Sequence, residues 1–317
     1  MNELEIIANI KKIIKNSSAL KLEDDVFFDK KKNLIASIDT YVENIHYINF
    51  KYPDLIIKKV IRSSISDILC KGANPKYLLI SFSGSKKHFN NKNIKLMIKS
   101  ISEEQKKFNF SLIGGDTTSS LKSSFTICSF SYSKKIIKRN DCLKGDDIYI
   151  TGNLGDSSVG LAILKKKIKT NNKIKKFFLD KYYKPDLPFG FHNDLLKFAN
   201  SSMDISDGLL SDIKKLIGKK KLGFIINFEH LPISSYFLKL IKQKKILYND
   251  HLYNGDVYQV VFTAKKKYRN AIIKSSMKWN QKLTRIGYIT SNITNYIKSS
   301  DKLKKINDYH GYIHNFN

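Results

Sequence analysis

Three observations predict an α/β fold for this chain of 317 residues. Short runs rich in β-branched and aromatic residues, typical of strands, alternate with segments whose apolar residues recur every three or four positions, as in amphipathic helices. The hydrophobic fraction of 42% is enough for a substantial core, which argues against wholesale disorder. A polar, basic segment at 133–147 interrupts the alternation, and we therefore expect two domains, residues 1–138 and 139–317.

The N-terminal part begins with an amphipathic pattern over 1–15, which predicts a helix. Two further helices are expected over 54–71 and 93–107, because isoleucines follow one side of each segment at helical spacing. Runs of β-branched and aromatic residues predict the strands of this part, namely 34–40, 77–83, 110–113 and 125–131.

The C-terminal part continues the alternation with strand-like runs at 148–151, 224–228 and 257–263. Helical spacing predicts helices over 157–168 and 209–217. The lysine-rich runs between these elements are expected to be solvated helix ends or loops.

The charge of the chain is extreme, with 57 Lys and Arg against 28 Asp and Glu, a formal net charge of +29. Such a basic chain raises the alternative of a nucleic-acid-binding protein. However, lysines occur in nearly every segment, and zinc-finger, basic-heptad and RNA-binding aromatic patterns are missing. The excess of Lys, Ile and Asn matches A/T-rich codons. We therefore favour a solvated basic surface that draws in anionic substrates.

The compartment is expected to be the cytoplasm. No apolar stretch approaches the roughly 20 residues that span a bilayer, and the N-terminus lacks the pattern of a signal peptide. Cys70, Cys128 and Cys142 are odd in number and widely spaced, so we expect reduced thiols in or near the core.

Aspartates are scarce in this chain, yet they recur in compact motifs at wide intervals. The motifs, in chain order, are Asp24-Asp25, Ser37-Ile38-Asp39, Ser66-Asp67, Gly114-Gly115-Asp116-Thr117-Thr118 and Asp204-Ile205-Ser206-Asp207-Gly208. Aspartate is a short, hard oxygen ligand, and several from distant segments can converge on Mg²⁺, which then neutralises and orients phosphates. Together the motifs favour a metal-phosphate site, although singly each is compatible with a turn, a strand end or a helix cap.

Two of these motifs suit phosphate binding in their own right. In residues 112–118 an apolar run meets two glycines, which let the backbone approach a ligand, and an acid and two hydroxyls follow. Residues 204–208 lead into a predicted helix. The free amides at the start of this helix could bind an anion, or Ser206 or Asp207 could cap them as the N-cap residue. The common nucleotide-binding patterns, GxxxxGK[ST] and GxGxxG after a strand, are missing, so phosphate chemistry here needs another scaffold.

In this order, the motifs resemble the thiamine-monophosphate kinase family, of the superfamily that includes aminoimidazole-ribonucleotide synthetase and selenophosphate synthetase. The resemblance runs from about Asp24 to Tyr312, nearly the whole chain. Besides the aspartates, it rests on the segments 37–47, 66–73, 151–158 and 255–258. The segment that carries His46 favours this family over its relatives.

The resemblance implies a fold as well as an activity. It implies a two-domain α/β (α+β) fold like that of aminoimidazole-ribonucleotide synthetase, in which the N-terminal sheet pairs across a homodimer into a barrel. The C-terminal domain would be an α/β layer that closes the active site.

The resemblance also implies a site, residue by residue. The implied ligands of several Mg²⁺ ions are Asp24, Ser37, Ile38 (through its backbone carbonyl), Asp39, Asp67, Asp116, Asp204 and Asp207. The implied ATP contacts are Gly115, Asp116, Arg139 and Ser206. The thiamine phosphate pocket would contain His46, Asp256 and Tyr309.

The implied reaction transfers the γ-phosphoryl group of ATP to thiamine phosphate, giving thiamine diphosphate and ADP. The nucleophile is already an anion, so we expect no general base and no covalent catalytic residue. Mg²⁺ and Arg139 would hold the two repelling phosphate groups in line. The alternatives are another ATP-dependent enzyme of the superfamily, a degenerate member that only binds nucleotide, and, from a different class, a basic nucleic-acid-binding protein.

The chain departs from the usual pattern of the family at four places, and the first is Glu23, where Gly usually precedes the two aspartates. Ile38 stands where Thr is usual, and Tyr309 stands where Trp is usual. Residues 254–259 read Asn-Gly-Asp-Val-Tyr-Gln where Gly-Gly-Glu-Asp-Tyr-Glu is usual, so acids are lost there. We expect these changes to affect substrate contacts more than the metal cluster.

Overall fold

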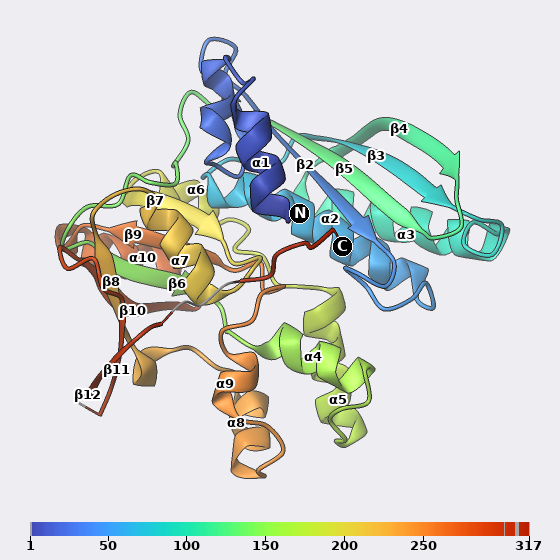
Figure 1. The fold of residues 1–317 in the computed structure, drawn as a ribbon. Helices are drawn as coiled ribbons and strands as arrows, with labels where there is room; N and C mark the ends of the chain where they lie inside the picture. The colour runs from blue at the N-terminus through green and yellow to red at the C-terminus, as the bar shows by residue number, and fades with distance from the viewer. Residues whose placement is uncertain (1, 301, 308–310, 317) are drawn as a thin grey trace.

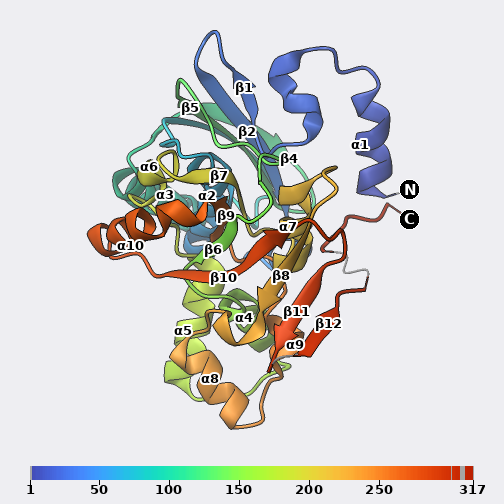
Figure 2. The ribbon, with the colours of Figure 1, turned by 90° about the vertical axis from the view of Figure 1, so that its left-hand side faces the viewer.

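The computed structural model describes residues 2–300, 302–307 and 311–316. Two β-sheets organise the chain, the first built from residues 27–132 and the second from residues 147–305. Figures 1 and 2 show these sheets with helix α2 (Pro53–Cys70) between them. The mixed α/β architecture predicted from the sequence is confirmed, while the boundary between residues 138 and 139 stays a prediction.

The first sheet has the strand order β1-β2-β5-β3-β4. Its strands are β1 (Phe27–Asp29), β2 (Leu34–Val42), β3 (Tyr77–Gly84), β4 (Ser111–Ser119) and β5 (Ser124–Tyr132). The β3–β4 pair is parallel and the other pairs are antiparallel. Strand β4 therefore forms an edge, next to β3 alone among the described strands.

Helices α2 and α3 (Asn91–Phe108) cover one face of this sheet (Figure 1). Because side chains alternate along a strand, Ile35 and Tyr41 of β2 point into the core, while Ile38 between them is 68% exposed. Ile113 of β4 and Tyr132 of β5 are also exposed. The face away from the helices is thus open and partly apolar.

Helix α2 begins at a proline, which suits a first helical position, and most of its residues are buried. Arg62 of this helix makes a bidentate ion pair with Glu104 of α3, with N–O distances of 2.7 and 2.8 Å. Arg62 also donates to the carbonyl of Pro185, at 3.3 Å, in the C-terminal part. The helix is therefore fixed to both halves of the molecule, which positions the acid that it carries.

The second sheet has the order β12-β11-β8-β10-β6-β9-β7, and among these pairs only β8 and β11 run parallel. Its strands are β6 (Asp147–Thr151), β7 (Ala199–Asp204), β8 (Gly223–Asn227), β9 (Val260–Ala264), β10 (Leu283–Thr290), β11 (Tyr296–Ser299) and β12 (Lys302–Lys305). Helix α7 (Leu209–Ile217) packs on this sheet through a core that includes Leu209, Ile213 and Leu216.

The remaining helices lie around these layers. They are α1 (Glu3–Lys11), α4 (Asp156–Leu164), α5 (Asn172–Tyr183), α6 (His192–Leu195), α8 (Ser235–Lys242), α9 (Tyr248–His251), α10 (Arg269–Lys278) and the 3-10 turns η1 (Ser17–Leu22), η2 (Phe228–His230) and η3 (Lys266–Tyr268). Helices α4, α5, α8 and α9 gather at the bottom of Figure 1, and α4, α5 and α8 share a small apolar core.

Most predicted elements are present, and the differences have local causes. Helix 209–217 has the predicted bounds, whereas the predicted helix 1–15 ends at Lys11. The predicted strand 257–263 begins only at Val260, because Asp256 and Tyr258 adopt positive φ angles of 63° and 56°. Their amides bond to the carbonyls of residues 206 and 205, so this segment is a loop and not a strand.

The two chain ends meet beside the first sheet (Figure 1). The amide of Glu3 donates to the carbonyl of His314 at 3.0 Å, and the amide of His314 donates to the Glu3 carboxylate at 3.3 Å. These contacts hold the C-terminal segment 311–316 in place. Within the described residues, no helix is both long and apolar enough to cross a membrane.

Candidate functional site

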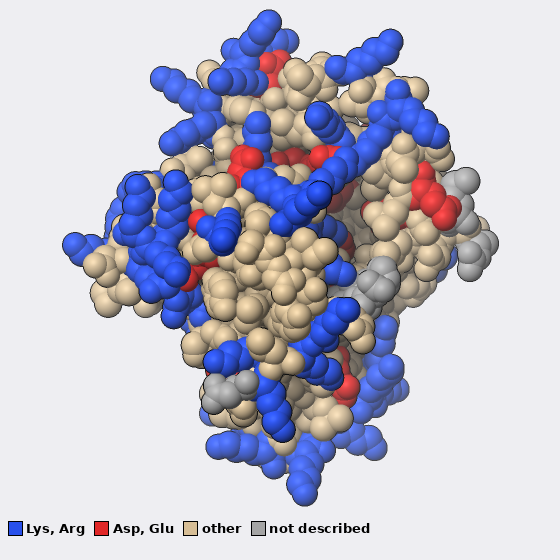
Figure 3. All heavy atoms as spheres, turned by 60° about the vertical axis from the view of Figure 1, so that its left-hand side comes forward, with Lys and Arg blue, Asp and Glu red and all other residues tan. Residues whose placement is uncertain are grey.

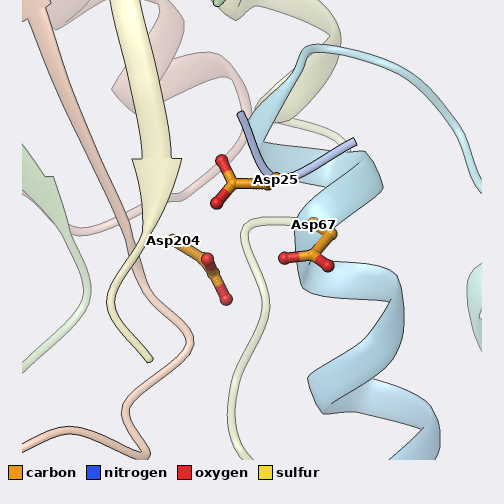
Figure 4. A group of neighbouring side chains, drawn as sticks. All are labelled: Asp25, Asp67 and Asp204. Carbon is orange, nitrogen blue, oxygen red and sulfur yellow. The ribbon is translucent and has the colours of Figure 1, made fainter. Parts of the chain in front are cut away.

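Three aspartates from separate segments converge between the two sheets (Figure 4). Asp25 lies in the loop before β1, Asp67 lies on α2, and Asp204 is the last residue of β7. Each offers one carboxylate oxygen, and these atoms all lie within 4.8 Å of one another. We call Asp25, Asp67 and Asp204 the carboxylate trio.

The carboxylate trio lies in surroundings that disfavour uncompensated negative charge. Burial raises the pKa of Asp67 well above its usual range, and the charges of Asp39 and Asp204 raise it further. Burial also raises the pKa of Asp204 to about 6, although a 2.5 Å hydrogen bond from Ser66 Oγ opposes the rise. Oxygen donors that repel one another in this way suit a hard divalent cation such as Mg²⁺.

Two cationic side chains lie beside the trio. The guanidinium of Arg139 contacts the Asp25 carboxylate, and its Nε is buried without a hydrogen-bond partner among the described residues. The ammonium of Lys71 lies 2.7 Å from Asp24 and also contacts Asp25. The site thus already contains fixed positive charge beside Asp24 and Asp25.

A pocket of about 520 Å³ extends from the trio. Asp67 and Asp204 line it together with Asp39, and Ser206 and Asp207 line it at the start of the loop before α7. Figure 3 shows acidic atoms in a hollow on one face of the molecule, overhung by Lys and Arg side chains. Such a basic surround raises the local concentration of anionic ligands.

Aromatic side chains also line the pocket, and His46 is among them. The amide of Val42 donates to His46 Nδ1 at 2.9 Å, so the neutral ring carries its hydrogen on Nε2. Burial and the nearby His314 lower the pKa of His46 to about 4. The His46 and His314 ring centroids are 5.4 Å apart, and Tyr41 meets His46 edge-on. His46 is therefore an uncharged aromatic donor near neutral pH.

Asp256 lies in the wall of the same pocket, on the loop before β9. Its two carboxylate oxygens are each 2.5 Å from the ammonium of Lys59, which is buried on α2. Ser157 donates to Asp256 at 3.1 Å, and the Lys59 ammonium lies 4.1 Å from the ring centroid of Tyr182. Asp256 is thus held by the protein itself and stiffens the pocket wall.

The predicted metal ligands are only partly brought together. Asp67 and Asp204 belong to the trio, and Asp39, whose pKa burial raises to about 6, lines the same pocket close enough to raise the pKa of both. The carboxylate of Asp24 instead bonds to Lys71 and to the backbone amide of Arg139, the latter at 3.0 Å. Asp207 pairs with Lys215 at the pocket edge.

The other predicted ligands lie on the first sheet. Ser37 is buried, and its Oγ has no hydrogen-bond partner among the described residues. Ile38 lines the pocket and is largely exposed. Asp116 is exposed on the edge strand β4, outside the carboxylate trio and outside the residues that line the pocket. All of these ligand assignments stay predictions.

The predicted nucleotide and substrate contacts are similarly divided. Arg139 lies at the trio, Ser206 lines the pocket, and Gly115 lies beside Asp116 on β4. A Cβ on Gly115 would lie 1.8 Å from the carbonyl oxygen of Ile80, so the close approach of β3 and β4 requires glycine there. Tyr309 lies outside the described residues.

Sequence reasoning missed four residues of this site, Asp25, Lys71, Tyr312 and His314. For Asp25 the signal was present, since it follows Asp24 directly, but only the path of the turn decides which carboxylate faces the trio. Tyr312 and His314 line the pocket from the C-terminal segment. Their closely spaced rings, 4.9 Å apart and perpendicular, form an aromatic cluster that the sequence GYIH could have suggested.

Comparisons with known proteins show which family the chain belongs to. A family model described as "AIR synthase related protein, N-terminal domain" matches residues 22–132. The thiamine-monophosphate kinase of Buchnera aphidicola subsp. Schizaphis graminum is 35% identical over 298 residues, covering 92% of this chain and 91% of the relative. The thiamine-monophosphate kinase of Escherichia coli K12 is 27% identical over 287 residues, covering 90% and 87%.

Solved structures share the fold. One described as AaThiL complexed with AMPPCP and TMP has a TM-score of 0.83 at 23% identity and covers 96% of both chains. The chain of a HypE-HypF complex that matches has a TM-score of 0.75 at 15% identity, covering 95% of this chain and 98% of that one. The likeness therefore extends over almost the whole molecule, both domains included.

Proposed function

The chain belongs to the thiamine-monophosphate kinase family, and we propose that it transfers the γ-phosphoryl group of ATP to thiamine phosphate, giving thiamine diphosphate and ADP. One observation carries the proposal beyond the family likeness. A single pocket is lined both by Asp67 and Asp204 of the buried carboxylate trio and by an aromatic cluster that includes His46 and His314. A structure of the same fold is a complex with AMPPCP and TMP, which supports the same pair of ligands here.

The carboxylate trio fits Mg²⁺ by its donor chemistry, and we infer that Asp25, Asp67 and Asp204 hold it, with Asp39 nearby. When bound, Mg²⁺ would neutralise and orient the phosphates of ATP. Without a cation these carboxylates repel one another in a buried setting, as the raised pKa of Asp67 reflects. The site therefore favours cation-assisted transfer over acid–base chemistry.

The residues of the chain itself would then position the two phosphates. The guanidinium of Arg139 is held at the trio by Asp25, where its positive charge would attract the phosphates of ATP. The acceptor oxygen of thiamine phosphate is already anionic, so the pocket has no need of a general base. Holding two like-charged groups in line by fixed cations is the main catalytic task.

The aromatic end of the pocket suits the rings of thiamine. The neutral His46 ring offers Nε2–H as a donor, and Tyr182, Tyr312 and His314 offer ring faces and edges. A cationic thiazolium ring is attracted to such faces. Asp256, already paired with Lys59, supports this wall.

We also propose a homodimer formed through the open face of the first sheet. Ile38, Ile113 and Tyr132 are 68%, 53% and 57% exposed on β2, β4 and β5, and β4 is an edge strand. An edge strand and exposed apolar side chains favour a partner. Asp116 on β4 would then lie at the interface. Light scattering should give twice the mass of the chain, and a monomer mass would contradict the dimer. Because ATP is the donor, we propose the cytoplasm as the compartment.

The experiment that tests the activity incubates the purified protein with Mg²⁺, ATP and thiamine phosphate and measures thiamine diphosphate by chromatography. The wild-type chain should form product, and Asp67→Asn should lower the rate by about 100-fold or more, because it removes a metal-holding carboxylate. Asp54→Asn, on the first turn of the same helix, is the matched control and should retain activity.

Two results would contradict the proposal. One is no product from the wild-type chain. That result would favour an enzyme of the superfamily that acts on another acceptor, or a family member that only binds nucleotide. The other is product formation that Asp67→Asn leaves unchanged. Thiamine offered in place of thiamine phosphate tests the acceptor. Its hydroxyl group would need a general base, and no residue of the pocket is assigned that role.

A further inference from the structure

The side chain of Lys71 is a fully buried ammonium at the edge of the carboxylate trio. Lys71 follows the last residue of α2, and its side chain is 0% exposed. The ammonium donates to the Asp24 carboxylate at 2.7 Å, contacts the Asp25 carboxylate, and donates to the carbonyl of Ser202 at 3.0 Å. These acceptors come from the loop before β1 and from β7, so Lys71 links three separate segments.

The donors of this ammonium are saturated by the protein. A lysine ammonium has three N–H groups, and Lys71 has three partners, none of which is a ligand. Because the side chain has no exposed surface, it is not placed to contact ATP or solvent. Its buried positive charge is tolerable only because two carboxylates compensate it. Lys71 therefore acts on the Asp24 and Asp25 carboxylates that it contacts.

The contact with Lys71 is one of three that fix the Asp24 carboxylate. Its carboxylate accepts from Lys71, from the amide of Asp25 at 2.9 Å and from the amide of Arg139 at 3.0 Å. These donors fix Asp24 toward the protein, while the carboxylate of Asp25 lies in the trio. A metal ion at Asp24 would have to displace an ammonium that occupies the same side of the carboxylate.

We propose that Lys71 acts as a built-in cation of this cluster, taking the place that a divalent ion would otherwise occupy between Asp24 and Asp25. The proposal rests on the metal-binding role given above to the carboxylate trio. It implies that Lys71 limits the number of divalent ions that the chain binds, and that Asp24 is a partner of Lys71 and not a metal ligand. Lys71 is thus a positioning residue, acting on the metal site through Asp25.

The test counts Mn²⁺ ions bound per chain by electron paramagnetic resonance, without nucleotide or thiamine phosphate. Lys71→Ala should bind one more Mn²⁺ than the wild-type chain, because the vacated space lies between two carboxylates that have lost their shared ammonium. Lys71→Arg, which keeps the charge, should bind the same number as the wild-type chain. An unchanged count in Lys71→Ala, with the fold verified by circular dichroism, would overturn the proposal.

A second variant keeps the proposal testable if Lys71→Ala fails to fold. Asp24→Asn in the wild-type background should leave the Mn²⁺ count unchanged and the affinity within about threefold, whereas Asp67→Asn should lose an ion. Loss of an ion in Asp24→Asn would overturn the role of Lys71. A wild-type chain that binds no Mn²⁺ at all would contradict the metal centre itself, so the two failures are distinguishable.

Discussion

The ammonium of Lys59 lies 2.5 Å from each carboxylate oxygen of Asp256, and this pair joins helix α2 to the loop before β9. The Lys59 side chain is 1% exposed and the Asp256 side chain is 30% exposed. The two side chains of the pair therefore differ in how much solvent reaches them. If Asp256 is removed, an ammonium is left in the interior, whereas if Lys59 is removed, a carboxylate is left that water can reach.

This asymmetry gives the first prediction. Asp256→Asn should lower the free energy of unfolding by about 3 kcal/mol, because it leaves a buried ammonium without its carboxylate partner. Lys59→Met should cost only about 1 kcal/mol, since the remaining carboxylate is partly solvated. Urea unfolding of both variants measures the difference. A larger loss in Lys59→Met than in Asp256→Asn would show that the pair is not arranged as described.

The second prediction concerns pH and His46, whose pKa is lowered to about 4 from 6.5. The folded state disfavours the charged ring, so stability is unaffected above pH 6.5 and is lost as pH falls from 6.5 toward 4. His46→Gln should remove that loss, which after discounting for partial exposure is on the order of 1 kcal/mol at pH 4.5. Thermal unfolding at pH 7.5 and 4.5 compares the two chains. If the wild-type chain and His46→Gln lose stability equally on acidification, His46 is not the group responsible.

The third prediction has the opposite sign and concerns Asp156 at the start of α4. Burial raises the pKa of this carboxyl from 3.8 to about 7, although a 2.7 Å hydrogen bond from Ser234 opposes the rise. The folded chain holds this proton more tightly, so stability falls as pH rises from 4 to 7. Asp156→Asn should therefore stabilise the chain by about 2 kcal/mol at pH 8 and hardly at all at pH 4. An equal effect at both pH values, measured by urea unfolding, would argue against a protonated Asp156 in the folded state.

The fourth prediction tests the packing of β3 against β4. Gly115→Ala should destabilise the chain by about 3 kcal/mol or more, because its Cβ would meet the backbone of Ile80. Gly145→Ala is the control, since its φ is also positive, at 84°, but no atom lies within 4 Å of the added Cβ. That change should cost only about 1 kcal/mol. Similar losses in the two variants would mean that backbone conformation, and not contact with β3, makes Gly115 necessary.

The sequence alone predicts those helices and strands in which the buried residues recur at a regular spacing. Helix α7 has the predicted bounds because its apolar residues recur on one face. Strand β7 (Ala199–Asp204) escaped prediction because its residues Ala-Asn-Ser-Ser-Met-Asp are mostly polar, although four of them are buried beneath neighbouring elements. Its burial comes from tertiary contacts, which no local pattern records. The helices α5, α8 and α10 were not predicted either.

The site was predictable in its chemistry more than in its geometry. The order of the motifs identified the carboxylates, and Asp67 and Asp204 do meet. That Asp25 joins them, while Asp24 turns to Lys71, depends on one turn of the backbone, which the adjacent pair of aspartates could not reveal. The path of the C-terminal segment, which brings His314 to His46, is likewise a long-range contact without a local signal.

A crystal structure with Mn²⁺, a non-hydrolysable ATP analogue and thiamine phosphate bound, in which anomalous scattering locates the metal, would test the metal site and the substrate pocket together. We expect a Mn²⁺ peak about 2.2 Å from carboxylate oxygens of Asp25, Asp67 and Asp204, a ligand distance normal for a hard divalent cation. Thiamine phosphate should occupy the same pocket with its rings beside His46 and its phosphate toward the metal. A trio without bound metal, or thiamine phosphate bound outside the pocket, would contradict the proposed site.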